Sequence, residues 1–176
     1  HEVQMYVRSR RHDGLAATLV RGSVGMTVHV GRPQGIDLLR RIDDRNVLAV
    51  AAGTGIAPVL SLVADPAVAE SARRVQIFYG GRTVEDLVAL ERLESIGRRF
   101  PRLDVLPVVT TSGGEPRLAT TLAGIIGSYA DWRRHRVIAA GPTDALEPTL
   151  SRLGALGVGD DDIIRADRRR VPSSTV

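Results

Sequence analysis

Two glycine-containing turns are places where the backbone could approach a phosphate group. The first, "GTGIAP" at residues 53–58, follows the apolar run "VLAVAA", and the second, "AGPTD" at residues 140–144, follows "RVIA". Glycine lets backbone N–H groups come close to a ligand, and the start of a helix favours negative charge. A strand-to-helix turn that only needs small residues explains each pattern as well. The candidate ligand contacts in these turns are Gly53, Thr54, Gly55, Ile56, Pro58, Gly141, Pro142 and Thr143.

Neither turn matches the common phosphate-binding fingerprints. The pattern G-x-G-x-x-G is incomplete because its third glycine is missing, and G-x-x-x-x-G-K-[ST] needs a lysine, which this chain lacks. Nucleotide binding is therefore predicted from several loops together and not from one motif.

Two further polar loops follow strand-like runs. In "YGGRT", Gly80 and Arg82 could lie beside a ribose or phosphate, although a surface arginine could equally pair with a nearby acidic side chain. In "TTSGGEPR", Thr111 and Ser112 could hold the adenosine side of a dinucleotide or simply form a polar loop.

We identify no catalytic or metal-ligating residue in the sequence. The four histidines are scattered, and the chain contains no cysteine. Ser61 and Ser112 have no histidine placed to activate them, and the run Asp160–Asp162 is more typical of a solvated loop than of a metal site. Such a chain could still belong to an enzyme if a bound cofactor supplies the chemistry.

Strand-like and helix-like segments alternate after residue 43, which predicts a parallel sheet flanked by helices. Strands are expected at residues 46–53, 74–81, 103–110, 135–141 and 162–166. Helices are expected at residues 57–65, 83–100, 118–129 and 142–157. In such sheets ligands bind beyond the carboxyl ends of the strands, where all four loops would meet.

Particular residues refine these elements. Pro107 predicts an edge position or a bulge for its strand. Thr83 and Asp86 have the spacing of a capping box at the start of the second helix. Pro148 predicts that the last helix is kinked or begins late.

The first 35 residues read as antiparallel β-structure with short links. The runs "VQMYVR" (residues 3–8) and "MTVHVG" (residues 26–31) alternate apolar and polar residues, as strands with one buried face do. A short helix is expected at residues 15–22, and "GRPQG" at residues 31–35 predicts a turn. This section is too short to fold as a domain alone.

The composition favours a globular protein without a membrane or nucleic-acid partner. Apolar residues make up 43% of the 176 residues, but no run is long enough to cross a membrane. All basic residues are arginines, and they concentrate at residues 8–12, 133–136 and 165–170. A nucleic-acid binder could show such clusters, but no aromatic residues are interleaved for stacking, so solvated edges explain them better. The absence of cysteine fits a cytoplasmic protein.

Three motifs in order, "AAGTGIAP", "VQIFYGGRTVEDL" and "RVIAAGPTDALEPTLSRLGALGV", resemble the pyridine-nucleotide domain of the ferredoxin–NADP reductase superfamily. The resemblance implies a Rossmann-like α/β domain at residues 44–167 that binds NADH or NADPH across its strand ends. Residues 1–43 would be the incomplete end of a flavin-binding β-barrel, and residues 168–176 a flexible basic tail. FAD would be bound by the full-length protein.

The resemblance also implies a role for each loop. Residues 53–58 would border the nicotinamide and pyrophosphate, Arg82, Thr111 and Ser112 would lie toward the adenosine ribose, and residues 141–143 would flank the nicotinamide. A hydride would pass to the flavin, and electrons would continue to an iron–sulfur or haem acceptor in the same or another chain, as in a flavohaemoglobin-like protein. NADH is favoured because the family's phosphate-binding arginine has no obvious counterpart in "VVTTSGG", although Arg117 could substitute.

Three departures from the family pattern favour an alternative, a degenerate non-catalytic nucleotide-binding or interaction module. Ala140 replaces the family's usual cysteine near the transferred hydride, Arg169 stands where many members have an aromatic residue, and Ala17 replaces a serine of the barrel. The chain begins at His1, and the main flavin-binding motif of the family would precede it. The fragment alone is therefore expected to be inactive.

Overall fold

The computed structural model describes residues 3–9, 12–31, 38–71, 73–109 and 118–166. The chain divides into two compact units, His1–Gly35 and Ile36–Val176. The predicted tail at residues 168–176 lies outside the described residues.

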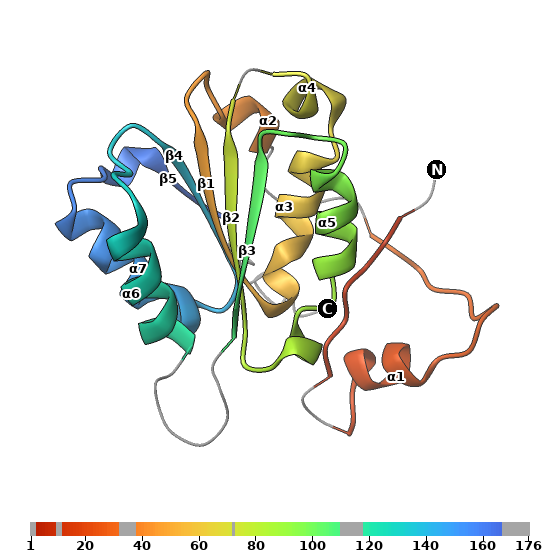
Figure 1. The fold of residues 1–176 in the computed structure, drawn as a ribbon. Helices are drawn as coiled ribbons and strands as arrows, with labels where there is room; N and C mark the ends of the chain where they lie inside the picture. Colours follow the sequence, from red (N-terminus) through yellow and green to blue (C-terminus); the bar gives the residue numbers. More distant parts are fainter. Residues whose placement is uncertain (1–2, 10–11, 32–37, 72, 110–117, 167–176) are drawn as a thin grey trace. The chain divides into compact units, whose positions relative to one another are not determined.

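The larger unit is an α/β domain built on a five-stranded parallel sheet (Figure 1). Its strands are β1 (Val47–Ala52), β2 (Val75–Gly81), β3 (Leu103–Val109), β4 (Arg136–Ala140) and β5 (Ile163–Arg165). All five predicted strands are confirmed, in the order β3-β2-β1-β4-β5. The chain moves outward from β1 in one direction through β2 and in the other through β4. The carboxyl ends of β1 and β4 therefore border a topological switch point, where open parallel sheets bind ligands.

Burial explains the strand sequences. Every residue of β1 and β2 is buried, as expected for central strands covered by helices on both faces. Pro107 lies on β3, at the edge of the sheet, which confirms its predicted edge position. An edge strand tolerates proline because a backbone N–H that points away from the sheet needs no partner strand.

Helices cover both faces of the sheet (Figure 1). On one face lie α3 (Ile56–Val63) and α5 (Leu90–Gly97), and on the other lie α6 (Leu118–Tyr129) and α7 (Thr143–Ala155). The short elements are α2 (Leu38–Arg41), α4 (Pro66–Ala69) and the 3-10 turns η1 (Gly53–Gly55), η2 (Val84–Asp86) and η3 (Asp160–Asp162). Among the described helices, none is long and apolar enough to span a membrane.

Two helix predictions need correction. Helix α7 begins at Thr143 and runs through Pro148, so of the two predicted alternatives, a kink or a late start, the late start is wrong. Pro148 removes one backbone donor, and burial of Leu146, Leu150 and Leu153 offsets that loss.

The predicted helix at residues 83–100 is interrupted. It consists of η2, a break over residues 87–89, and α5. The predicted capping box is absent, because Thr83 makes no side-chain cap and the Asp86 carboxylate accepts a hydrogen bond from the backbone N–H of Arg82. Asp86 thereby closes the turn after β2 instead of starting a continuous helix.

The smaller unit contains α1 (Leu15–Arg21), as predicted, but the strand predictions at residues 3–8 and 26–31 are wrong. Neither run forms a strand, and their apolar side chains, including Val3, Met5 and Val30, are exposed. Alternation specifies which face a strand would bury, but a strand also needs hydrogen bonds from a neighbouring strand. The predicted antiparallel barrel end is therefore not formed in the described residues, and most of the predicted turn at residues 31–35 lies outside them.

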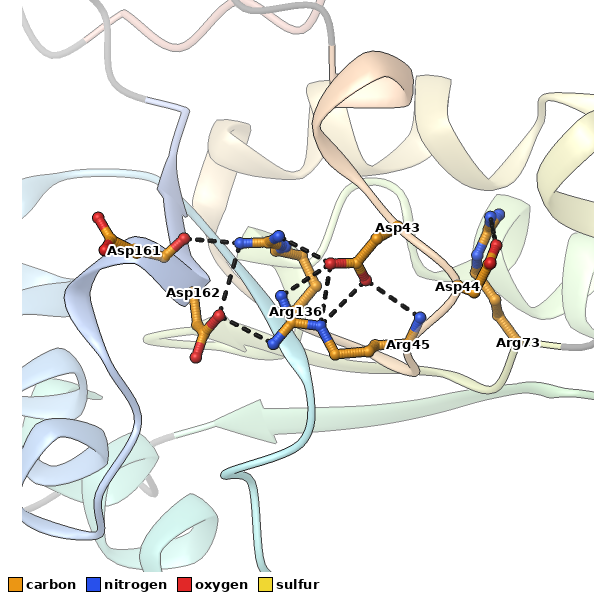
Figure 2. A network of polar contacts seen from close by, with 7 residues as sticks. All are labelled: Asp43, Asp44, Arg45, Arg73, Arg136, Asp161 and Asp162. Carbon is orange, nitrogen blue, oxygen red and sulfur yellow. Dashed lines mark hydrogen bonds and ion pairs between the residues drawn. The ribbon is translucent and has the colours of Figure 1, made fainter.

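A network of charged side chains joins the amino-terminal ends of β1, β4 and β5 (Figure 2). The Asp43 carboxylate accepts hydrogen bonds from Arg45 Nη2 and Arg136 Nη2, each at 2.8 Å. Asp162 accepts a hydrogen bond from Arg45 Nη1 at 2.8 Å, and Arg136 Nη1 donates to the Asp161 carbonyl. The guanidinium groups of Arg45 and Arg136 hold the pKa of Asp43 well below its ordinary value of 3.8.

Replacing Asp43 with asparagine is expected to lower the free energy of unfolding at neutral pH by about 1 kcal/mol. The effect is modest because 41% of the Asp43 side chain is exposed and solvent screens the charges. A depressed carboxylate pKa contributes its full stabilisation above the unfolded pKa, so the difference between wild type and variant should shrink as the pH falls below 3.8.

Urea unfolding at several pH values measures this difference. Asp161→Asn is the matched control, because Asp161 joins the network through its backbone carbonyl. An equal loss of stability in both variants would show that the Asp43 carboxylate has no special role.

Candidate functional site

The turn after β1 contains a glycine in a left-handed conformation and a buried isoleucine that fixes the turn to the core. Gly53 has a φ of +54°, in the left-handed region that favours glycine. The backbone N–H of Ile56 donates to the carbonyls of Gly53 and Thr54, and the Ile56 side chain is fully buried. Pro58 lies in the first turn of α3, where a missing backbone N–H breaks no helical hydrogen bond. The buried Ile56 side chain and the hydrogen bonds of its N–H thus fix the turn. Gly53, Thr54 and Pro58 remain partly exposed.

The turn after β4 leads directly into α7. Ala140 is fully buried, and Gly141 is partly exposed with a φ of +150°. Pro142 precedes the helix in an extended conformation, and Thr143 is the first helical residue. Both Pro142 and Thr143 are exposed at the carboxyl edge of the sheet.

These two turns are in direct contact. A Cβ atom added to Gly55 would overlap the Ala140 carbonyl oxygen and lie 2.5 Å from the Cα of Gly141. A Cβ atom added to Gly141 would lie 3.0 Å from the carbonyl oxygen of Ala52. The structure thus brings the two glycine-containing turns together, and each depends on a glycine to allow the contact.

The end of β2 lies beside the turn after β1. Gly80 is buried and in register with Ala52. The Arg82 side chain is 71% exposed, and its Nε lies 3.7 Å from Asp86 Oδ2. Of the alternatives for Arg82, pairing with Asp86 is present, and the guanidinium is also accessible to a ligand.

The remaining predicted contacts, Thr111 and Ser112, lie outside the described residues, as does Arg117. The described part of β3 ends at Val109, in register with Gly81. The carboxyl end of β3 therefore lies at the same edge of the sheet as the carboxyl ends of β1, β2 and β4.

The sequence did not single out a charged pair beside the second turn. Arg165 Nη1 donates to Glu147 Oε2 at 2.9 Å. Arg165 is in register with Ala139, and the N–H of Ala166 donates to the Ala139 carbonyl. No sequence spacing signals this pair, because its members come from a helix and a separate strand.

The arrangement suits a long ligand that contains phosphate groups. Backbone turns, the starts of α3 and α7, and the Arg82 cation share one edge of the sheet at its switch point. Fold and site together define a dinucleotide-binding α/β domain.

Comparison with known proteins shows which proteins the chain resembles. Residues 49–126 match the oxidoreductase NAD-binding domain family. The chain is 34% identical over 137 residues to the ferredoxin–NAD(P)(+) reductase component of the naphthalene 1,2-dioxygenase/salicylate 5-hydroxylase systems of Ralstonia sp. That alignment covers 75% of this chain and 42% of the Ralstonia protein. The α/β unit is thus an NAD-binding domain like those of ferredoxin–NAD(P)(+) reductases, which confirms the resemblance of its three motifs.

Solved structures share this fold. A ferredoxin NADP+ reductase from Neisseria gonorrhoeae with bound FAD and NADP superposes with a TM-score of 0.69 at 17% identity, covering 88% of this chain and 70% of that one. A flavohemoglobin from Malassezia yamatoensis with bound FAD and heme gives a TM-score of 0.59 at 20% identity, covering 70% of this chain and 32% of that one.

Proposed function

We propose that this chain is the NAD(P)H-binding part of a flavin-dependent reductase that passes a hydride from nicotinamide to flavin. The contact between the glycine turns after β1 and β4, at the switch point of the sheet, is the main observation that supports it. Similarity to a ferredoxin–NAD(P)(+) reductase component favours an iron–sulfur acceptor, and a haem acceptor is the other candidate. The bound nucleotide supplies the hydride, while the residues of this chain bind and orient it.

The proposed orientation follows the order of the loops along the edge. Residues 53–58 border the pyrophosphate and the nicotinamide, and residues 141–143 flank the nicotinamide. Arg82, Thr111 and Ser112 lie toward the adenosine ribose. The partly exposed small residues of the two turns fit a flat ring and a phosphate group, and the exposed Arg82 fits the ribose end.

We place the flavin site mainly in the rest of the full-length protein, with residues 1–43 contributing its end and residues 44–167 forming the nucleotide domain. The exposed apolar side chains of Val3, Met5 and Val30 support this division, because further chain packed on them would remove them from water. The isolated chain is then expected to bind nucleotide without oxidising it. A reductase of this kind acts where NAD(P)H is supplied, which favours the cytoplasm.

Measurements of flavin content and NAD(P)H oxidation on the full-length protein decide between this function and a degenerate nucleotide-binding module. Ala140 and Ala17, both buried, are the described residues that favour the degenerate module, since the family usually has cysteine and serine at these positions. A flavin-containing protein that oxidises NADH or NADPH with a dye acceptor would establish the reductase. A protein that binds nucleotide but neither binds flavin nor reduces a dye would establish the degenerate module.

NADH is expected to bind more tightly than NADPH. Asp86 already neutralises part of the Arg82 charge, which leaves less of it to attract an added 2′-phosphate. Titration of the chain with both nucleotides by calorimetry measures the preference. Tighter binding of NADPH that is lost in Arg117→Ala would reverse it and assign the phosphate contact to Arg117.

A further inference from the structure

Gly55 has no space for a side chain because another part of the backbone fills that space. The position of its missing Cβ overlaps the Ala140 carbonyl oxygen and lies 2.5 Å from both the Ala140 carbonyl carbon and the Gly141 Cα. Separations under about 3 Å between a Cβ and backbone atoms do not occur without a shift, and here neither neighbour is a flexible side chain.

We propose that Gly55 is a positioning residue that holds the turn after β4 in place and does not itself open the backbone to a phosphate. This inference rests on the proposed function, because it assigns the two glycines of "GTG" to different parts of one nucleotide site. Gly53 and Gly55 are both partly exposed, and Gly53, with its left-handed φ, is the glycine that we assign to the approach of a phosphate.

A second close contact adds to the first and makes the two turns one packed unit. Gly55 packs on Ala140 and Gly141, and Gly141 packs in turn on Ala52, the last residue of β1. Ala140 is in register with Ala51, so the β1–β4 pairing continues directly into this contact. The places of Pro142 and Thr143 therefore depend on the absence of a side chain at Gly55.

A methyl group at Gly55 would displace the turn after β4 more than the turn after β1. The turn after β1 is held by the buried Ile56 side chain and by the two hydrogen bonds of the Ile56 N–H. Pro142 and Thr143 are exposed, so fewer packing contacts oppose their displacement. Binding of the nicotinamide half of the dinucleotide should therefore weaken, while binding of the adenosine half beside Arg82 should not change.

Calorimetric titration of this chain with NADH and with ADP-ribose, which lacks the nicotinamide, tests the proposal. Wild type should bind NADH more tightly than ADP-ribose. Gly55→Ala should lose about tenfold in NADH affinity while ADP-ribose affinity stays within about threefold. Gly154→Ala is the matched control, because an added Cβ there meets nothing within 4 Å, and it should leave both affinities unchanged.

A second variant covers the case in which Gly55→Ala does not fold. Gly141→Ala disturbs the same region from the other turn, since its Cβ would lie 3.0–3.1 Å from atoms of Ala52 and its φ of +150° disfavours alanine. It should show the same selective loss. Thermal unfolding verifies that each variant is folded at the temperature of the titration.

The outcomes separate this inference from the proposed function. If wild type binds no NADH, NADPH or ADP-ribose, the proposed function is wrong. If wild type binds them, three results would overturn the role of Gly55. These are equal losses of NADH and ADP-ribose affinity in Gly55→Ala, a selective loss of ADP-ribose affinity, and a wild type that does not prefer NADH.

Discussion

Replacing Trp132 with alanine is expected to reduce the free energy of unfolding by about 3–5 kcal/mol. Trp132 is fully buried in the core between the sheet and helices α6 and α7. Its ring packs edge-on against Phe78 at a centroid distance of 5.9 Å and is stacked with Tyr129 at 6.1 Å. Alanine would leave a large cavity, which a close-packed core cannot fully close.

Trp132 also provides a hydrogen-bond donor for a carbonyl at the end of α6. Its Nε1–H donates to the Ile126 carbonyl at 2.8 Å, and Ile126 lies in the last turn of α6, where carbonyls have no helical partner. Trp132→Phe keeps most of the packing but removes this donor. It should destabilise the domain by about 1–3 kcal/mol, which is less than the alanine variant.

Urea unfolding followed by far-UV circular dichroism measures these losses, since the chain has only one tryptophan for fluorescence. Tyr129→Ala is the control within the same aromatic cluster, and its effect should be smaller because 48% of Tyr129 is exposed. A Trp132→Ala variant that is no less stable than Tyr129→Ala would contradict this account of the core.

The sheet could be predicted from the sequence because its signals are local. A strand buried on both faces needs an uninterrupted apolar run, and "VLAVAA" of β1 provides one. The edge position of β3 could also be predicted locally, because Pro107 has no backbone N–H to donate to a second neighbouring strand.

The failed predictions concern interactions with distant or absent neighbours. Alternation at residues 3–8 and 26–31 says nothing about which strand would pair with them, and no strand forms. Asp86 bonds to the Arg82 N–H, so the helix predicted after Thr83 starts only at Leu90.

Ion pairs between residues far apart in the sequence could not be predicted either. Asp43 and Arg136 are 93 positions apart, and either could have paired with many other charges in the chain. Only the β1–β4 pairing brings them together, so the network follows from the fold and not from any motif.

The candidate site was predictable as a set of loops but not as a set of contacts. Strand ends and glycines indicated where the turns after β1 and β4 would lie. A glycine, however, signals only that a side chain is excluded, and the sequence cannot say whether ligand or backbone takes its place. The structure distinguishes the two glycines. At Gly55 backbone atoms occupy the place of a Cβ atom, whereas Gly53 has a left-handed φ.

That distinction gives the second large expected effect. Gly53→Val should weaken NADH binding about 100-fold or more. Valine disfavours a φ of +54°, and its branched side chain would cover the backbone that the proposed site presents to a pyrophosphate. Lost hydrogen bonds to a charged group alone are worth about 1.5–3 kcal/mol each.

Gly25→Val separates the binding effect from backbone strain. Gly25 has a φ of +94°, an added Cβ there meets nothing within 4 Å, and it belongs to the smaller unit. Both variants should lose a similar amount of stability, about 1–2 kcal/mol, because each forces a branched residue into a left-handed conformation. Only Gly53→Val should lose NADH affinity in calorimetric titration. Equal NADH affinities for the two variants would mean that the turn after β1 does not hold the pyrophosphate, and the phosphate-binding role would then pass to the loops after β2 and β3.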